Sequence, residues 1–206
     1  MKVVLASQNR HKLSEIQTIL SRYGMDVVLQ SELGIEIDVD ETGTTFEENS
    51  YLKAQAVCDA TGLPAIADDS GLCVDVLGGE PGVYSARYGG PEYVSDLDRL
   101  NLLLKNLRGI RSEERTARYV CVITLLMPDG ERIVTRGTCE GMILSEPHGT
   151  GGFGYDPIFY IPREGMTFAE MGIERKNQIS HRANALRMLC DRLDEKMEKE
   201  KADDNE

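Results

Sequence analysis

The chain has 206 residues, of which 41% are hydrophobic and 28% are charged, a balance typical of one sizeable globular domain rather than two independent ones. Its formal net charge of −12 argues against general affinity for nucleic acid, so an anionic ligand would need a local cluster of positive side chains. The longest apolar stretch, VCVITLLM at 120–127, is too short to cross a membrane, and no signal peptide is visible. Because the five cysteines also form no C-x-x-C pair, we expect a soluble cytoplasmic protein with reduced thiols.

Hydrophobic periodicity and turn residues divide the chain into strands and helices. The expected strands are 2–6, 26–30, two short strands around an acidic turn within 65–82, and a long β-hairpin over 118–143. The expected helices are 11–23, 45–61, 97–109 and a last helix that begins at Ser180. This pattern predicts an α/β fold with a mixed sheet, in a single domain over 1–193. Residues 194–206 carry seven acids against three lysines, which predicts a disordered tail.

Basic side chains begin two of the predicted helices, where the helix dipole disfavours them by roughly 0.3–1 kcal/mol each. Arg10, His11 and Lys12 lie at the first start, and His181 and Arg182 lie at the second. A bound phosphate would reverse the effect, since backbone N–H groups and basic side chains would converge on it. The alternative is that these side chains bend into solvent or reach a nearby acid.

Acidic residues gather in DVDETG (38–43) and ADDSG (67–71). Asp68 and Asp69 are adjacent at the end of an apolar strand, which is costly unless a cation or hydrogen bonds compensate their charges. Carboxylates with open coordination positions suit Mg²⁺, which takes one or two of them together with waters and phosphate oxygens. The alternative is an ordinary solvated turn, because Asp, Ser and Gly are common turn residues. Lys53, on the helix over 45–61, is likewise either a ligand-binding or a solvated lysine.

A loop with four glycines, GTGGFGYD at 149–156, allows its backbone to approach a ligand closely. Phe153 and Tyr155 offer flat faces, and Asp156 offers an acceptor for a base N–H group. A long connection without a ligand is the alternative. The sequence has no G-x-S-x-G motif and no cysteine in a basic setting, so a covalent mechanism is not expected. These features together indicate a nucleoside-phosphate site with Mg²⁺.

Five segments, in this order along residues 2–190, resemble the inosine/xanthosine triphosphate pyrophosphatase family. They are LASQNRHKLSEI, ETGTTFEENSYLKA, AIADDSGLCVDVLGGEPGVYSARYGG, GTGGFGYDPIF and ISHRANAL. The resemblance implies a two-lobed α/β fold with a long mixed β-sheet flanked by helices, a central substrate cleft and a homodimer. It also implies Mg²⁺-dependent hydrolysis of non-standard purine nucleoside triphosphates (ITP, dITP and XTP) to the monophosphate and pyrophosphate, which cleans the nucleotide pool.

The resemblance also implies roles for individual residues. At the triphosphate it places Ser7, Gln8, Asn9, Lys12 and Lys53, with Gln8 where the family usually has glycine. It places Asp69 at the metal and the attacking water, with Asp68 close by, and either Asp40 or Glu41 as the second acid of the metal site. It places Ser70 beside the substrate. At the purine base it places Phe153, Gly154, Tyr155, Asp156, Lys176, His181 and Arg182.

Two other functions stay open at this point. One is a related pyrophosphatase that acts on modified pyrimidine nucleotides, which a substrate panel would separate from a purine enzyme. The other is a nucleotide-binding module without catalysis, which Mg²⁺-dependent turnover would exclude. A donor such as Arg182 favours a 6-oxo purine over a 6-amino one, because adenine would leave the donor unpaired.

Overall fold

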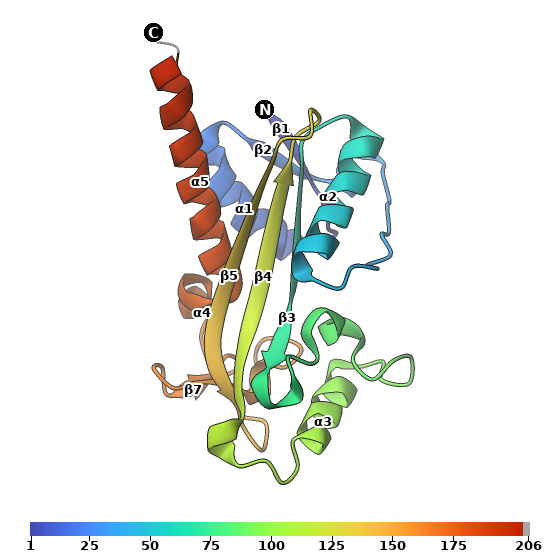
Figure 1. The fold of residues 1–206 in the computed structure, drawn as a ribbon, viewed down its shortest axis with the longest axis vertical. Helices are drawn as coiled ribbons and strands as arrows, with labels where there is room; N and C mark the ends of the chain where they lie inside the picture. Colours follow the sequence, from blue (N-terminus) through green and yellow to red (C-terminus); the bar gives the residue numbers. More distant parts are fainter. Residues whose placement is uncertain (204–206) are drawn as a thin grey trace. The chain divides into compact units, whose positions relative to one another are not determined.

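The computed structural model describes residues 1–203 and divides the chain into two compact units (Figure 1). The first unit comprises Met1–Asp69, Cys121–Gly137 and the residues from Ala185 on. The second unit comprises Ser70–Val120 and Thr138–Asn184. Each unit has its own hydrophobic core, and within the described residues no helix is long and apolar enough to span a bilayer. All five cysteines lie in the described part of the chain as thiols, as the sequence predicts.

The structure contains each predicted helix, the first two predicted strands and the predicted hairpin. The strands are β1 (Lys2–Leu5), β2 (Asp26–Leu29), β3 (Ala65–Val74), β4 (Thr116–Leu126), β5 (Arg132–Ile143), β6 (Phe159–Ile161) and β7 (Met166–Thr167). The α-helices are α1 (Arg10–Leu20), α2 (Phe46–Thr61), α3 (Asp96–Asn106), α4 (Ile173–Ile179) and α5 (His181–Asp203). Short 3₁₀ helices are η1 (Ser21–Tyr23), η2 (Gln30–Leu33), η3 (Asp75–Leu77), η4 (Gly82–Arg87), η5 (Ser112–Glu114) and η6 (Asp156–Ile158).

The strands form one open sheet in the order β2-β1-β3-β4-β5-β6-β7. β1 pairs in parallel with β2 and β3, whereas β5, β6 and β7 pair antiparallel. The sheet is therefore mixed, and the predicted α/β class is confirmed. Because β3, β4 and β5 are long, each of them contributes residues to both units.

In the first unit the sheet is covered by helices on both faces. Side chains alternate along β1, so that Val3 and Leu5 pack with residues of α1 and α5, while Val4 packs with residues of α2. The same alternation continues in β3, where Ile66 belongs to the α1 and α5 side. Its neighbour Ala67 belongs to the α2 side. Because side chains alternate in this way along β3, the next two residues, Asp68 and Asp69, point to opposite faces of the sheet.

The second unit is built around aromatic and leucine side chains. Leu100, Leu103 and Leu107 of the α3 segment pack in one cluster with Tyr119, Phe159 and Phe168. The Phe159 ring meets the Tyr119 ring edge-on with centroids 4.7 Å apart, and lies 5.1 Å from the Phe168 ring. Such ring pairs contribute beyond the apolar area that they bury.

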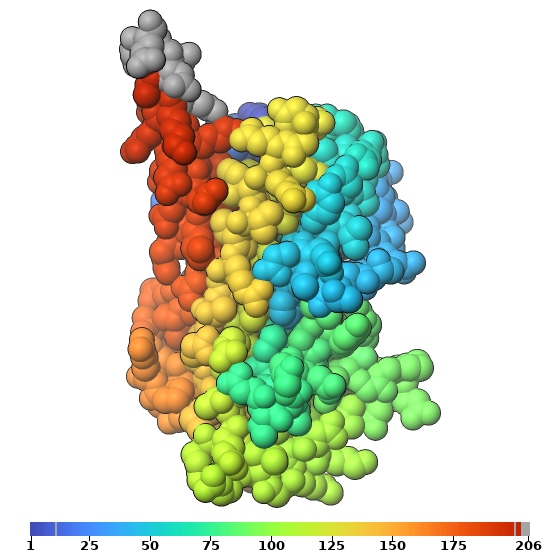
Figure 2. Space-filling model, in the orientation of Figure 1, coloured from blue at the N-terminus to red at the C-terminus, as the bar shows by residue number. Residues whose placement is uncertain are grey.

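Local residues decide where the predicted helix over 45–61 and the predicted hairpin begin, turn and end. Thr45 and Glu48 form a capping box at the start of α2, and Gly62 ends that helix in the left-handed conformation. The predicted hairpin turns at PDG, where Gly130 has φ of 90° and Met127 N–H donates to the Glu131 carbonyl at 2.8 Å. This turn is exposed, as the yellow segment of Figure 2 shows.

The prediction for residues 65–82 was wrong. This segment does not contain two strands around an acidic turn, because β3 runs without interruption through the DDSG residues. Turn propensity is overridden there by ion pairs to both carboxylates, described below. Three elements had not been predicted, namely the short strands β6 and β7 and the helix α4, which has seven residues between a glycine N-cap and Ser180.

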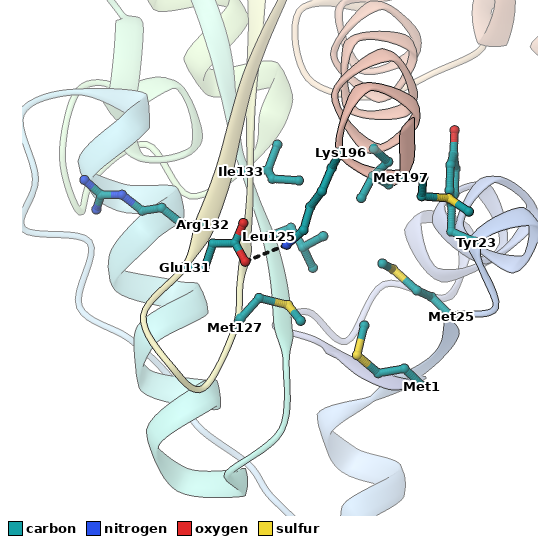
Figure 3. Close-up of a pocket in the computed structure, with 11 residues that line it drawn as sticks. Met1, Tyr23, Met25, Leu125, Met127, Glu131, Arg132, Ile133, Lys196 and Met197 are labelled. Carbon is teal, nitrogen blue, oxygen red and sulfur yellow. Dashed lines mark hydrogen bonds and ion pairs between the residues drawn. The ribbon is translucent and has the colours of Figure 1, made fainter. Parts of the chain in front are cut away.

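The described part of the tail is helical rather than disordered, since α5 continues to Asp203, and residues 204–206 lie outside the description. Leu193 is buried. Met197, one helical turn later on the same side of α5, lines with it an apolar cavity of about 280 Å³ (Figure 3). Lys196 also forms an ion pair with Glu131 of the hairpin turn. These contacts, together with good helix formers such as Glu, Lys and Met, extend the helix. The lining is rich in methionine and comprises Met1, Tyr23, Met25, Leu125, Met127, Glu131, Arg132, Ile133, Leu193, Lys196 and Met197.

We expect Leu103→Ala to lower the free energy of unfolding by about 2–5 kcal/mol, because Leu103 is fully buried in the second unit. The matched control on the same helix is Leu97→Ala, whose side chain is 61% exposed and whose loss should cost less than about 0.5 kcal/mol. Urea denaturation followed by circular dichroism measures both changes. Equal effects of the two substitutions would contradict this packing of α3.

Candidate active site

Two adjacent buried acids in β3 form the centre of the first unit's polar site. Asp68 is 4% exposed and Asp69 is 7% exposed. Because side chains alternate across a strand, Asp68 follows Ile66 to the face of α1, and Asp69 follows Ala67 to the face of α2. The two carboxylates therefore point to opposite faces of β3, and each one meets a lysine from the helix on its own face.

On the α1 face, Lys12 Nζ lies 2.7 Å from Asp68 Oδ1. The turn between β1 and α1 presents this lysine, because Asn9 Oδ1 accepts from the Lys12 N–H and caps the helix, while Ser7 Oγ accepts from the Asn9 N–H. Gln8 is exposed, and no described residue other than glycine has a positive φ. Gln8 therefore occupies its place in the turn without left-handed backbone. The side chain of His11 lies outside the description.

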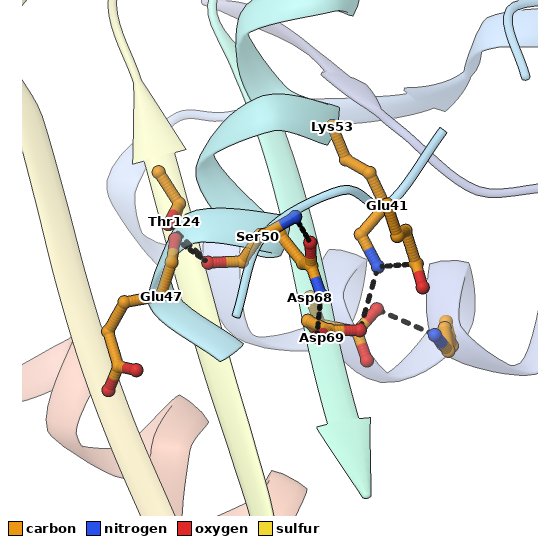
Figure 4. A network of polar contacts seen from close by, with 10 residues as sticks. Glu41, Glu47, Ser50, Lys53, Asp68, Asp69 and Thr124 are labelled. Atoms are coloured by element: carbon orange, nitrogen blue, oxygen red, sulfur yellow. Dashed lines mark hydrogen bonds and ion pairs between the residues drawn. The ribbon is translucent and has the colours of Figure 1, made fainter. Parts of the chain in front are cut away.

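On the α2 face, Lys53 lies between two carboxylates. Its Nζ is 2.6 Å from Glu41 Oε1 and 3.1 Å from Asp69 Oδ1 (Figure 4). The Lys53 side chain is 17% exposed, so water screens these pairs only in part. Asp40, the other acid that the sequence offered, is exposed. Glu41 is therefore the member of the pair that the structure brings to Asp69.

Asn49 completes a ring of contacts on this face. It is fully buried one helical turn before Lys53, and its Nδ2 donates to Asp69 Oδ2 at 3.3 Å. Its Oδ1 accepts from the Gly43 N–H at 2.8 Å, two residues after Glu41. Asn49 and Lys53 thus connect the loop that carries Glu41 to Asp69. Asn49 was not among the predicted site residues, although a poor helix former inside a helix is a usable signal.

Burial and charge act in opposite directions on the ionisation of this ring. Burial raises the pKa of Asp69 above its usual range, and the nearby Glu41 charge adds to the rise, although Lys53 and Asn49 favour the carboxylate. Burial alone would lower the pKa of Lys53, but the charges of Asp69, Glu41 and Asp68 outweigh it and raise that pKa. Lys53 therefore stays protonated, and Asp69 is a stronger base than an exposed aspartate.

The residues on the α2 face fit a hard divalent cation. Among residues 1–203, no three His, Cys, Asp or Glu side chains gather closely enough to hold a metal on their own. Asp69 and Glu41 nevertheless direct carboxylate oxygens at one cationic group, the Lys53 ammonium. Mg²⁺ is commonly held by one or two carboxylates and completes its shell with waters and substrate phosphates. Two carboxylates are therefore a sufficient protein contribution.

In the second unit, the glycine loop is organised around the buried Asp156. Its Oδ2 accepts from the Phe153 N–H at 2.9 Å and also pairs with Lys176 Nζ at 2.5 Å. The Lys176 ammonium lies 4.9 Å from the centre of the Phe153 ring and 5.0 Å from that of Phe168. Asp156 therefore holds the loop together, and the Phe153 ring, 66% exposed, offers its surface for stacking.

The other residues expected at the base differ in exposure. Tyr155 is buried, and its hydroxyl donates to the Ser85 carbonyl at 2.9 Å. His181 is 7% exposed and stacks on Tyr119 with ring centroids 4.8 Å apart. Arg182 follows it in the first turn of α5 and is half-buried. Ser180 Oγ caps this helix by accepting from the Ala183 N–H at 3.2 Å.

The predicted site residues thus fall into two groups. The first unit brings together Ser7, Asn9, Lys12, Glu41, Lys53, Asp68 and Asp69 around β3, with Gln8 exposed at the turn. The second unit holds Ser70 in β3 and, around the glycine loop and the start of α5, Phe153, Gly154, Tyr155, Asp156, Lys176, His181 and Arg182.

We expect Gly43→Ala to lower the free energy of unfolding by about 1–3 kcal/mol, because its Cβ would lie 2.6 Å from both Asn49 Oδ1 and Glu48 Cβ. Thermal and urea denaturation measure the loss. Gly172→Ala is the control, since a Cβ there would meet no atom within 4 Å and the residue has φ of −63°. A Gly43→Ala protein as stable as the control would contradict the close approach of Gly43 to α2.

Comparisons with known proteins cover nearly the whole chain. The dITP/XTP pyrophosphatase of Escherichia coli O157:H7 is 52% identical over 194 residues, which are 93% of this chain and 98% of that protein. The dITP/XTP pyrophosphatase of Thermus thermophilus is 51% identical over 191 residues, covering 93% and 91%. The solved structure of the Staphylococcus aureus Ham1 protein has a TM-score of 0.88 at 44% identity, covering 95% of this chain and 100% of that one. Since residues 3–192 also match the Ham1 family, the chain belongs to that family.

Proposed function

We propose that the chain hydrolyses non-standard purine nucleoside triphosphates, namely ITP, dITP and XTP, between the α- and β-phosphates. The products are the nucleoside monophosphate and pyrophosphate. The single observation that carries the proposal is the largely buried ring of Asp69, Lys53, Glu41 and Asn49, which combines a base with a cation suited to phosphate. The relatives named dITP/XTP pyrophosphatase support the same reaction.

Lys12 and Lys53 bind the triphosphate and stabilise the charge that develops on the leaving pyrophosphate. Each lysine already faces a carboxylate, so its ammonium is held in place before the substrate arrives. At an effective dielectric constant near 20, one charge pair about 4 Å apart is worth roughly 4 kcal/mol. The turn of Ser7, Gln8 and Asn9 adds N–H donors at the start of α1.

Asp69 accepts the proton of the attacking water, and burial strengthens it as a base. We propose that Asp69 and Glu41 hold a Mg²⁺ ion, with Asp40 as the less favoured second acid because it is exposed. When bound, such an ion supplies positive charge that neutralises phosphate oxygens and eases deprotonation of water. Asp68, on the other face of β3, acts by fixing Lys12.

The second unit selects the base. The exposed Phe153 ring stacks on the purine, while Arg182 donates to a 6-oxo group and leaves a 6-amino group without a partner. His181 is held by its stacking on Tyr119. Lys176 positions Phe153 through the contact of its ammonium group with the face of the ring. A homodimer and a cytoplasmic location stay predictions, the first measurable by light scattering after size-exclusion chromatography.

A substrate panel tests the proposal. The protein is incubated with Mg²⁺ and, separately, with ITP, XTP, GTP, ATP and a modified pyrimidine triphosphate, and pyrophosphate and orthophosphate are assayed independently. We expect pyrophosphate from ITP and XTP, with little from ATP or GTP. Orthophosphate as the first product would place the cut at another bond. A preference for the pyrimidine would favour the related pyrimidine enzyme, and no turnover would favour a binding module.

We expect Asp69→Asn to lower kcat by roughly 10²–10⁴-fold, because the amide no longer accepts the proton of water. The matched control is Asp59→Asn on the exposed part of α2, where Asp59 Oδ1 accepts from Gln55 Nε2 at 2.6 Å. Circular dichroism checks that both proteins are folded. Turnover by Asp69→Asn within a few fold of wild type would exclude Asp69 as the base.

We expect Arg182→Ala to reduce the ratio of kcat/KM for ITP over ATP by about 10-fold or more, because a buried hydrogen bond to the 6-oxo group is lost. The control is Arg192→Ala on the same helix, whose side chain is 65% exposed. Initial rates with both nucleotides give the ratio. An unchanged ratio in the Arg182 protein would remove this residue from base selection.

A further inference from the structure

Two successive backbone N–H groups of the glycine loop are held by two different carboxylates. The Phe153 N–H donates to Asp156 Oδ2 at 2.9 Å, and the Gly154 N–H donates to Asp96 Oδ2 at 2.8 Å. Asp156 belongs to the loop itself, whereas Asp96 is the first residue of α3, far away in the sequence. The two peptide groups that flank Phe153 are therefore both fixed, the one before it from within the loop and the one after it from outside the loop.

Both carboxylate oxygens of Asp96 accept hydrogen bonds, although the side chain is 53% exposed. Its Oδ1 accepts from Arg99 Nη2 at 2.6 Å, and Arg99 Nη1 donates to the carbonyls of Tyr93 and Val94 at 2.9 and 3.2 Å. The Arg99 side chain is only 14% exposed. The hydrogen bond from Arg99 lowers the pKa of Asp96, and the Gly154 N–H contributes in the same direction. Asp96 is thus ionised at neutral pH, and each of its oxygens already has a donor.

The glycine loop needs such an anchor. Gly152 and Gly154 have positive φ values of 74° and 59°, and glycine loses more conformational freedom than other residues when it is ordered. Between them lies Phe153, whose ring covers the Lys176 ammonium on one side and is otherwise 66% exposed. A ring fixed before the base arrives binds it at a smaller entropic cost than a ring on a mobile loop.

We propose that Asp96 is a positioning residue for base selection, which acts by holding the Gly154 N–H and thereby the orientation of the Phe153 ring. This inference rests on the proposed function, since it assigns the loop to the purine base. Asp96 does not touch the reacting atoms. Its removal therefore changes binding and discrimination and leaves the chemical step in place.

The test compares Asp96→Ala, Asp96→Asn and Asp98→Ala. Asp96→Ala removes the acceptor for the Gly154 N–H, whereas Asp96→Asn keeps an oxygen that accepts from it. Asp98→Ala is the matched control, because it breaks the capping box with Ser95 at the same helix start without touching the loop. The measurements are hydrogen–deuterium exchange of residues 151–155, and kcat and KM with ITP and with ATP.

We expect Asp96→Ala to speed exchange of the loop amides, to raise KM for ITP by roughly 5–10-fold, and to reduce the ITP-over-ATP ratio of kcat/KM by a similar factor. Its kcat with ITP should stay within about threefold of wild type, because the first-unit residues are untouched. Asp96→Asn should recover most of both losses, and Asp98→Ala should show neither of them.

Three results would overturn the role of Asp96. They are unchanged exchange in Asp96→Ala, faster exchange with KM and discrimination unchanged, and equal effects of Asp98→Ala. Wild-type protein without turnover on any purine would instead overturn the proposed function, and this role with it. The exchange data then still report whether Asp96 anchors the loop, so the two failures are distinguishable.

Discussion

The first unit depends on how β3 accommodates two adjacent buried carboxylates. An uncompensated buried charge costs several kcal/mol, so neither Asp68 nor Asp69 is tolerable inside a strand without a partner. Alternation of side chains sends the two acids to opposite faces, where α1 supplies Lys12 and α2 supplies Lys53. The positions of both helices over the sheet are therefore tied to these ion pairs. Removing one lysine takes away the cation that offsets its buried acid, which harms the fold as well as the chemistry.

Much of this arrangement was predictable from local sequence, and the remainder was not. The helix over 45–61 and the hairpin over 118–143 are decided by neighbouring residues, such as the Thr45–Glu48 capping box and the PDG turn, and these two predictions are confirmed. The DDSG segment is a strand instead of a turn because partners from α1 and α2 outweigh local turn propensity. The helical tail is stabilised by apolar side chains around the methionine-rich cavity and by the ion pair of Lys196 with Glu131, and these partners are distant in sequence. The links of Asn49 to Gly43 and of Asp96 to Gly154 likewise join segments that no local pattern connects.

The polar contacts of the two units differ in kind: ion pairs dominate in the first unit, and hydrogen bonds to backbone N–H groups dominate in the second. In the first unit, cations and carboxylates neutralise one another at distances of 2.6–3.1 Å, an arrangement that a triphosphate with its cation can enter by exchanging partners. In the second unit, Asp156 and Asp96 are satisfied by the loop's own N–H groups, by Lys176 and by Arg99. Their hydrogen bonds fix a shape and leave the Phe153 ring as the exposed surface. Under the proposed function, the charges of the first unit serve the phosphates and the hydrogen-bonded loop of the second unit serves the base.

The central claim is that Lys12 and Lys53 stabilise pyrophosphate as it leaves while Asp69 directs water at the α-phosphorus. The most direct measurement is single-turnover hydrolysis of ITP in water enriched in ¹⁸O, with mass analysis of both products. The account predicts one ¹⁸O atom in inosine monophosphate and none in pyrophosphate. Label in pyrophosphate would show attack at the β-phosphorus with the monophosphate leaving, and would contradict the roles given to both lysines.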